Sequence, residues 1–232
     1  LIGSLFAWGI ARQTGGSRIA GGVGGTARLQ RTVTHLTPPP GLAFDEFGSI
    51  AISPDGRQVA AIAGLALWVR DLSSTSWVRL PGTETASFPF WSPDGESIAF
   101  SSESRRALMV VSRSGSTPPV KVCDQAMNGM GSWHENGTIL FTAGPTNRVE
   151  MTRVGWGRSE IVSQAQPGEV VHVWPQMLPD GRRFLFVAVR VGETRGTNAL
   201  CLGTIGSTSP HRTVLADVSN VQVLGSNRIA FV

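Results

Sequence analysis

Short apolar segments separated by polar turns recur along this chain at a nearly constant interval. Four of the turns carry Asp-Gly or Asn-Gly, and their glycines lie 39, 42 and 44 residues apart. An apolar run follows each turn: QVAAIA, SIAF, TILF and RFLFVA. A period of about 40 to 45 residues with such turns is typical of β-propeller blades. The turn residues are Asp55, Gly56, Asp94, Gly95, Asn136, Gly137, Asp180 and Gly181.

Each repeat divides into four short strands, and no segment shows a helical period. The pattern therefore predicts an all-β fold, a β-propeller of four-stranded antiparallel blades. Four blades are expected over residues 47–215, with a partial fifth that starts at Val221. Each Asx-Gly turn should join the first strand of its blade to the second, with positive φ at both central positions. In the fourth blade the first strand is predicted at residues 173–178.

Aligning the turns produces two columns that hold mostly bulky residues. The first column holds Ile52, Trp91, Trp133 and Met177, and the second holds Ser49, Phe88, Met130 and Trp174. A large side chain that recurs once per blade most simply packs one blade against the next. An aromatic ligand cage is the alternative interpretation.

Residues 1–31 lack the repeat pattern. Residues 1–11 form an apolar run that is shorter than the ~20 residues needed to span a bilayer. We interpret it as the end of a transmembrane helix or signal peptide, or as a buried terminal segment. Residues 12–31 contain six glycines, four arginines and no acidic residue, as flexible linkers do. We therefore expect a membrane-proximal stub and Gly/Arg-rich linker at 1–31 and a partial propeller at 32–232.

The charge is mildly basic, with 20 Lys plus Arg against 16 Asp plus Glu and a net charge of +4. The arginines are dispersed along the chain and form no continuous stripe, so the pattern does not indicate nucleic-acid binding. Cys123 and Cys201 lie in different repeats among apolar neighbours. They are predicted to be core residues rather than a disulfide pair.

Four segments resemble the TolB-type, WD-like propeller repeat of bacteria. They are ISPDGR from Ile52, LWVRDL from Leu67, FWSPDG from Phe90 and WPQMLPDGR from Trp174. Their order resembles the propeller half of bacterial membrane serine/threonine protein kinases, in which a kinase domain, one membrane helix and a short linker precede the propeller. The resemblance covers about residues 33–232.

This resemblance implies a ring of the six-bladed type in the intact protein and a sensing or protein-binding role. It also implies a bacterial membrane or periplasmic location, with the propeller outside the cytoplasm and a membrane anchor upstream of residue 12. The four arginines of the linker favour the cytoplasm for that flank instead. A soluble periplasmic TolB-like scaffold and the non-catalytic propeller of a serine peptidase are the alternatives.

Catalytic motifs are absent from the sequence. No Gly-rich phosphate loop precedes Lys121, which is the only lysine, and H-R-D, D-F-G and G-x-S-x-G do not occur. The four histidines have no metal-ligand spacing. One turn carboxylate per blade does not supply the several oxygen ligands that calcium needs. We therefore expect no catalytic residue, no metal, no cofactor and no enzymatic activity in this chain.

Binding through loops at the mouth of the central channel is the remaining use of a propeller. The segments that lead into the first strands are the default positions for a protein or small-molecule ligand. Glu46, Phe88, Met130 and His172 are the candidate contacts in these segments. Ordinary loop or core packing is the alternative for each of them.

Overall fold

The structure is a computed structural model that describes residues 35–45, 50–124, 130–190, 198–218, 221–223 and 229–231. The chain divides into two units, Leu1–Thr37 and Pro38–Val232, and most of the first unit lies outside the described residues. The expected stub, linker and domain boundary therefore stay predictions. Among the residues described, none forms a helix with the length and apolarity that a membrane span requires.

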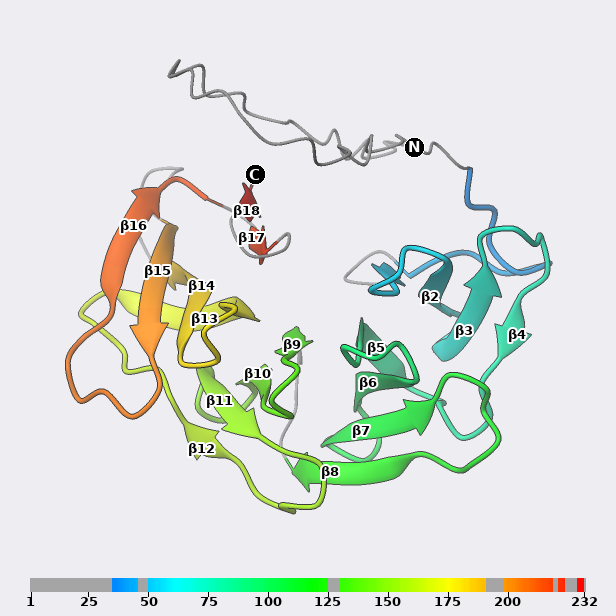
Figure 1. Cartoon of the computed structure of the whole chain (residues 1–232), viewed down its shortest axis with the longest axis horizontal. Helices are drawn as coiled ribbons and strands as arrows, with labels where there is room; N and C mark the ends of the chain where they lie inside the picture. Colours follow the sequence, from blue (N-terminus) through cyan, green and yellow to red (C-terminus); the bar gives the residue numbers. More distant parts are fainter. Residues whose placement is uncertain are drawn as a thin grey trace, which may run out of the picture. The chain divides into compact units, whose positions relative to one another are not determined.

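The unit Pro38–Val232 is built from strands that pair in sequence order. In the described residues, four four-stranded antiparallel sheets follow one another along the chain, and a two-stranded sheet comes after them. Consecutive sheets contact each other through their first strands, and in Figure 1 they succeed one another around an arc. The predicted fold, four propeller blades and the first two strands of a fifth, is confirmed.

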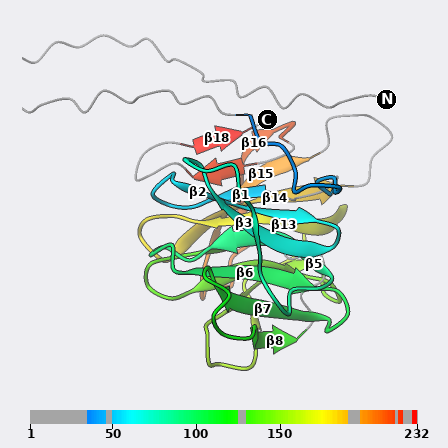
Figure 2. The same cartoon turned by 90° about the vertical axis from the view of Figure 1, so that its right-hand side faces the viewer.

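Each blade is a meander whose first strand lies on the inner side of the arc and whose fourth strand lies on the outer side (Figure 1). Blade 1 comprises β1 (Ile50–Ile52), β2 (Gln58–Ala63), β3 (Ala66–Asp71) and β4 (Val78–Arg79). Blade 2 comprises β5 (Ala86–Trp91), β6 (Ser97–Ser102), β7 (Ala107–Ser112) and β8 (Val120–Asp124). Figure 2 shows β6, β7 and β8 one below the other.

The remaining strands repeat this order. Blade 3 comprises β9 (Gly131–Trp133), β10 (Ile139–Ala143), β11 (Arg148–Thr152) and β12 (Glu160–Ile161). Blade 4 comprises β13 (Glu169–Met177), β14 (Arg183–Arg190), β15 (Ala199–Thr204) and β16 (Arg212–Ala216). The fifth sheet pairs β17 (Val221–Val223) with β18 (Ile229–Phe231).

The four Asx-Gly turns connect first and second strands as predicted, but their backbone differs from the prediction. Only the glycine has positive φ, which is 70° at Gly56, whereas Asp55 does not. The Asp55 carboxylate accepts hydrogen bonds from the Ser53 hydroxyl at 2.6 Å and from the Arg57 amide at 3.0 Å. The Ser53 amide donates to the Gln58 carbonyl and closes a four-residue loop. Aspartate therefore serves as an acceptor for loop donors, not as a left-handed residue.

Apolar side chains between consecutive blades form the core. Trp91 of blade 2 is buried in one cluster with Ile62 and Leu67 of blade 1, and its Nε1 donates to the Ala51 carbonyl at 3.0 Å. Ile52, in the same column, is 61% exposed because no described blade precedes it. The other two members of the column, Trp133 and Met177, pack in the second and third apolar clusters. The packing role predicted for this column is therefore confirmed at three of its four positions.

Replacing Trp91 with alanine tests this packing. We expect Trp91→Ala to lower the free energy of unfolding by about 3–5 kcal/mol, because it opens a cavity between two blades and removes a hydrogen bond that joins them. Trp156→Ala is the control, since Trp156 is 39% exposed on the loop between β11 and β12. Its loss should cost less than about 1 kcal/mol. Urea denaturation measures both values, and equal losses would contradict the assigned role of Trp91.

Candidate functional site

Two aromatic residues on inner strands have an unusual backbone conformation. Phe88 lies within β5 at a break in the strand register, and its φ is 51°. Trp174 lies at a similar break in β13, and its φ is 49°. Positive φ is rare for bulky side chains, and such residues cluster at binding sites. These two β-bulges are therefore the candidate ligand-binding positions.

The other predicted contacts have different surroundings. Met130 directly precedes β9 and, like Trp174, packs at the edge of the apolar cluster that joins blade 4 to β17. Phe88 is not part of this cluster. Glu46 lies outside the described residues, so its role stays a prediction. The packing predicted for Trp174 is confirmed by this cluster. Its bulge was not predicted, and the column that it shares with Phe88 and Met130 was the available signal.

The placement of His172 in a loop is wrong. The first strand of blade 4 begins at Glu169 instead of residue 173, so His172 lies inside β13. The pairing of Glu169 with Arg190 across β13 and β14, supported by their ion pair at 3.2 Å, extends the sheet to this point. The His172 side chain is fully buried and packs on Phe186, with ring centroids 4.6 Å apart. His172 is therefore a core residue, not an exposed ligand contact.

Glu169 is the centre of a buried polar cluster in blade 4. Its side chain is fully buried, and Oε2 accepts from the Gln166 amide at 2.8 Å and lies 3.1 Å from His172 Nε2. Oε1 lies 3.0 Å from His211 Nε2 and 3.2 Å from Arg190 Nη2. Four donors thus surround one carboxylate, which offsets the cost of burying its charge.

The protonation states follow from burial and these contacts. Burial opposes ionisation of Glu169, but the hydrogen bonds from Gln166, His172 and His211 outweigh it and lower the pKa of this carboxyl to about 2. Burial lowers the pKa of His172 to about 4, although the hydrogen bond to Glu169 partly opposes this. At neutral pH, Glu169 is ionised and His172 is neutral. Since Nε2 of His172 donates to Glu169, its Nδ1 is an acceptor.

Ser163 connects this cluster to blade 3. Its hydroxyl donates to His172 Nδ1 at 2.7 Å and accepts from the Val149 amide in β11 at 2.9 Å. Ser163, His172 and Glu169 therefore include the side-chain types of an acyl-transfer triad. Ser163 is only 3% exposed, and the cavity that it lines has a volume of about 10 Å³, the room for roughly one water. No substrate fits there, so this chain of hydrogen bonds links two blades.

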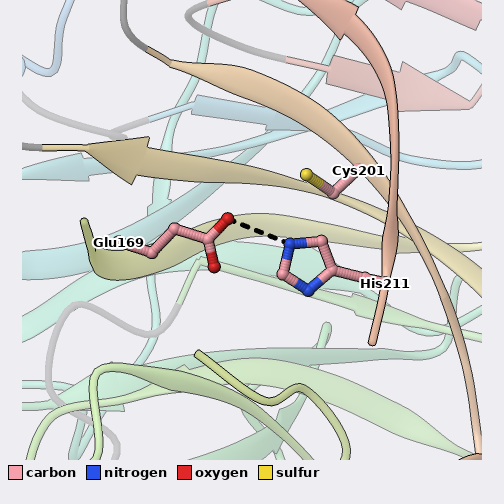
Figure 3. Close-up of side chains that lie close together, drawn as sticks. All are labelled: Glu169, Cys201 and His211. Carbon is pink, nitrogen blue, oxygen red and sulfur yellow. Dashed lines mark hydrogen bonds and ion pairs between the residues drawn. The ribbon is translucent and has the colours of Figure 1, made fainter. Parts of the chain in front are cut away.

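Cys201 of β15 lies beside Glu169 and His211, as Figure 3 shows. One ligand atom from each of the three side chains lies within 4.8 Å of the other two, so they could hold a metal ion. They are 32 and 10 residues apart in sequence, and no local spacing indicated them. Both cysteines are free and buried, as predicted, and burial raises the pKa of the Cys123 thiol to about 11.

The Ser163 link can be tested by removing its hydroxyl. Ser163→Ala leaves His172 Nδ1 and the Val149 amide without their partner inside the protein. We expect the free energy of unfolding to fall by about 1–3 kcal/mol. Ser116→Ala, on the exposed loop between β7 and β8, is the control and should change stability by less than about 0.5 kcal/mol. Chemical denaturation of both variants gives the comparison, and an unchanged Ser163→Ala protein would refute the link.

No protein-family model matches this sequence, and no curated protein matches it. Among solved structures, TolB from Acinetobacter baumannii is similar over 72% of this chain and 43% of its own, with 14% identity and a TM-score of 0.57. A chain of a nidogen/laminin complex is similar over 76% of this chain and 68% of its own, with 10% identity and a TM-score of 0.57.

Puromycin hydrolase is similar over 71% of this chain and 28% of its own, with 16% identity and a TM-score of 0.51. At these identities the comparisons establish the fold, a TolB-like β-propeller, and nothing finer. This chain spans less than half the length of the TolB structure.

Proposed function

We propose that this chain is a non-enzymatic binding module that senses a ligand or docks a protein partner. The proposal rests on the repeated bulge at Phe88 and Trp174, where two aromatic residues are held at positive φ on inner strands. Such a conformation is unfavourable by about 1–3 kcal/mol and persists where the surrounding structure fixes it. Aromatic side chains on rigid elements are common anchors for recognition.

We assign this module to the extracytoplasmic part of a bacterial membrane serine/threonine protein kinase. The order of the repeat segments and the apolar run at residues 1–11 support this assignment. A soluble periplasmic TolB-like scaffold is a second candidate, which the likeness to TolB supports. The non-catalytic propeller of a serine peptidase is a third, which the likeness to puromycin hydrolase supports. The flanking sequence in the parent gene separates them, because a kinase domain, a signal peptide or a nucleophile elbow is recognisable there.

Peptides selected from a displayed random library provide a probe for the binding site. Against selected peptides, Phe88→Ala or Trp174→Ala should weaken binding at least tenfold, which corresponds to about 1.4 kcal/mol. Val120→Ala is the matched control, because Val120 is 60% exposed on the outer strand β8. Thermal unfolding of each variant verifies that the blades remain folded. Peptides that bind both bulge variants as tightly as the unmodified chain would contradict the proposed site.

The absence of catalysis is a separate prediction. Hydrolysis or phosphoryl transfer requires an accessible nucleophile or base with charge stabilisation around the reacting group. Ser163, the residue nearest to that description, is buried beside a cavity of about 10 Å³. We expect no turnover of ATP, peptides or esters by the purified chain. Turnover above background that Ser163→Ala abolishes would overturn the non-enzymatic assignment.

A further inference from the structure

Three metal-ligating side chains from separate segments of blade 4 converge in its interior (Figure 3). Glu169 is the first residue of β13, Cys201 lies within β15, and His211 directly precedes β16. Their ligand atoms lie within 4.8 Å of one another. Zinc binds sulfur at about 2.3 Å and nitrogen or oxygen at about 2.0–2.2 Å, so donors around one ion are about 3–4 Å apart. Binding would require the three atoms to move from within 4.8 Å of one another to that spacing.

We propose that Glu169, Cys201 and His211 form a site for a divalent transition-metal ion with the chemistry of zinc. A thiolate, an imidazole and a carboxylate are a ligand set that zinc accepts. Magnesium and calcium prefer sites made of oxygen ligands, so the cysteine and histidine favour a softer ion. This site is independent of the proposed binding function, which concerns the inner-strand bulges.

His211 provides a second observation at this site. Its side chain is 3% exposed, and its Nδ1 has no hydrogen-bond partner among the residues that the structure describes. Buried polar atoms without partners are rare and call for a water or ion nearby. When Nε2 binds the ion, the ring proton resides on Nδ1. His211 also lines the cavity of about 10 Å³, which has room for roughly one water that could accept this proton's hydrogen bond.

The charges in the site are compatible with a divalent ion. Glu169 and the Cys201 thiolate supply two negative charges, and the thiol proton is released to solvent when the ion binds. Oε2 of Glu169 keeps its hydrogen bonds from the Gln166 amide and from His172 Nε2. These hydrogen bonds orient the carboxylate so that Oε1 faces the ion. Arg190 contacts Oε1 at 3.2 Å and competes with the ion. Its side chain is 35% exposed, and metal binding would require its guanidinium to move away from Oε1.

A bound ion would link the first, third and fourth strands of blade 4. All five residues of β16 are exposed, so this outer strand has little apolar packing of its own. Coordination by His211 would fix the start of β16 to Glu169 and Cys201. We infer a structural role for the ion, because the three ligand side chains are buried and the adjacent cavity is too small for a substrate. Three protein ligands leave the fourth position of a tetrahedral ion to a water.

Cobalt(II), a spectroscopic substitute for zinc, tests the site in the purified full chain after treatment with a chelator. Thiolate ligation produces an intense cobalt charge-transfer absorption. We expect the unmodified chain and Cys123→Ala to show it with one equivalent of cobalt, and Cys201→Ala to lack it. Cys123 is the matched control, as the other buried free cysteine. Zinc should displace the cobalt absorption and raise the unfolding temperature.

The cobalt titration of the unmodified chain is sufficient to overturn the proposal. If no charge-transfer absorption appears at excess cobalt, the chain has no metal site that contains a cysteine. Loss of the absorption in Cys123→Ala, with retention in Cys201→Ala, would also refute it. If Cys201→Ala does not fold, His211→Gln serves as the second variant and should weaken cobalt binding at least tenfold. Unchanged affinity in His211→Gln would exclude His211 as a ligand.

Discussion

Packing of each blade against the next is the interaction on which the rest of this structure depends. In β6 the last five of six residues are buried, and in β10 all five are, so both faces of these strands are covered. A single four-stranded sheet cannot cover two faces by itself, so the blades are stable only as a stack. This constraint explains why the second strands read as continuous apolar runs and not as alternating patterns.

Between blades 3 and 4 the apolar packing is supplemented by hydrogen bonds of buried groups. Thr142 Oγ1 donates to the His172 carbonyl at 3.0 Å, and the His172 amide donates to the Asn147 carbonyl at 3.0 Å. Ser163 adds the link from Val149 to the His172 ring. Apolar contacts tolerate sliding, whereas a satisfied polar network has one alignment. The cluster around Glu169 therefore fixes how these two blades meet, with or without a metal ion.

The sequence predicts those parts of the fold that depend on local pattern. Strand runs and Asx-Gly turns are local, so the four blades and the positions of their turns are confirmed, although the predicted positive φ at the Asx residues is wrong. The start of β13 was missed because the segment EVVHVW has no break at residue 173, and only the distant partner Arg190 determines that pairing begins at Glu169. The positive φ of Phe88 could not be predicted, because the residue types around it do not indicate a left-handed backbone. The convergence of Glu169, Cys201 and His211 depends on tertiary contacts that no spacing encodes.

The strained bulges and the packing between blades are connected. Next to Phe88, Phe90 is buried in the cluster shared with blade 3, and Trp91 in the cluster shared with blade 1. Next to Trp174, Val173 is buried toward β17, and Met177 toward blade 3.

The inner strands β5 and β13 are thus each held by both neighbouring blades within a few residues of the bulge. A positive φ that is unfavourable by about 1–3 kcal/mol persists because changing it would disturb two packed interfaces. The same burial that stabilises the stack therefore holds the two aromatic residues in one fixed conformation, which would lower the entropy cost of the ligand binding that we propose at these positions.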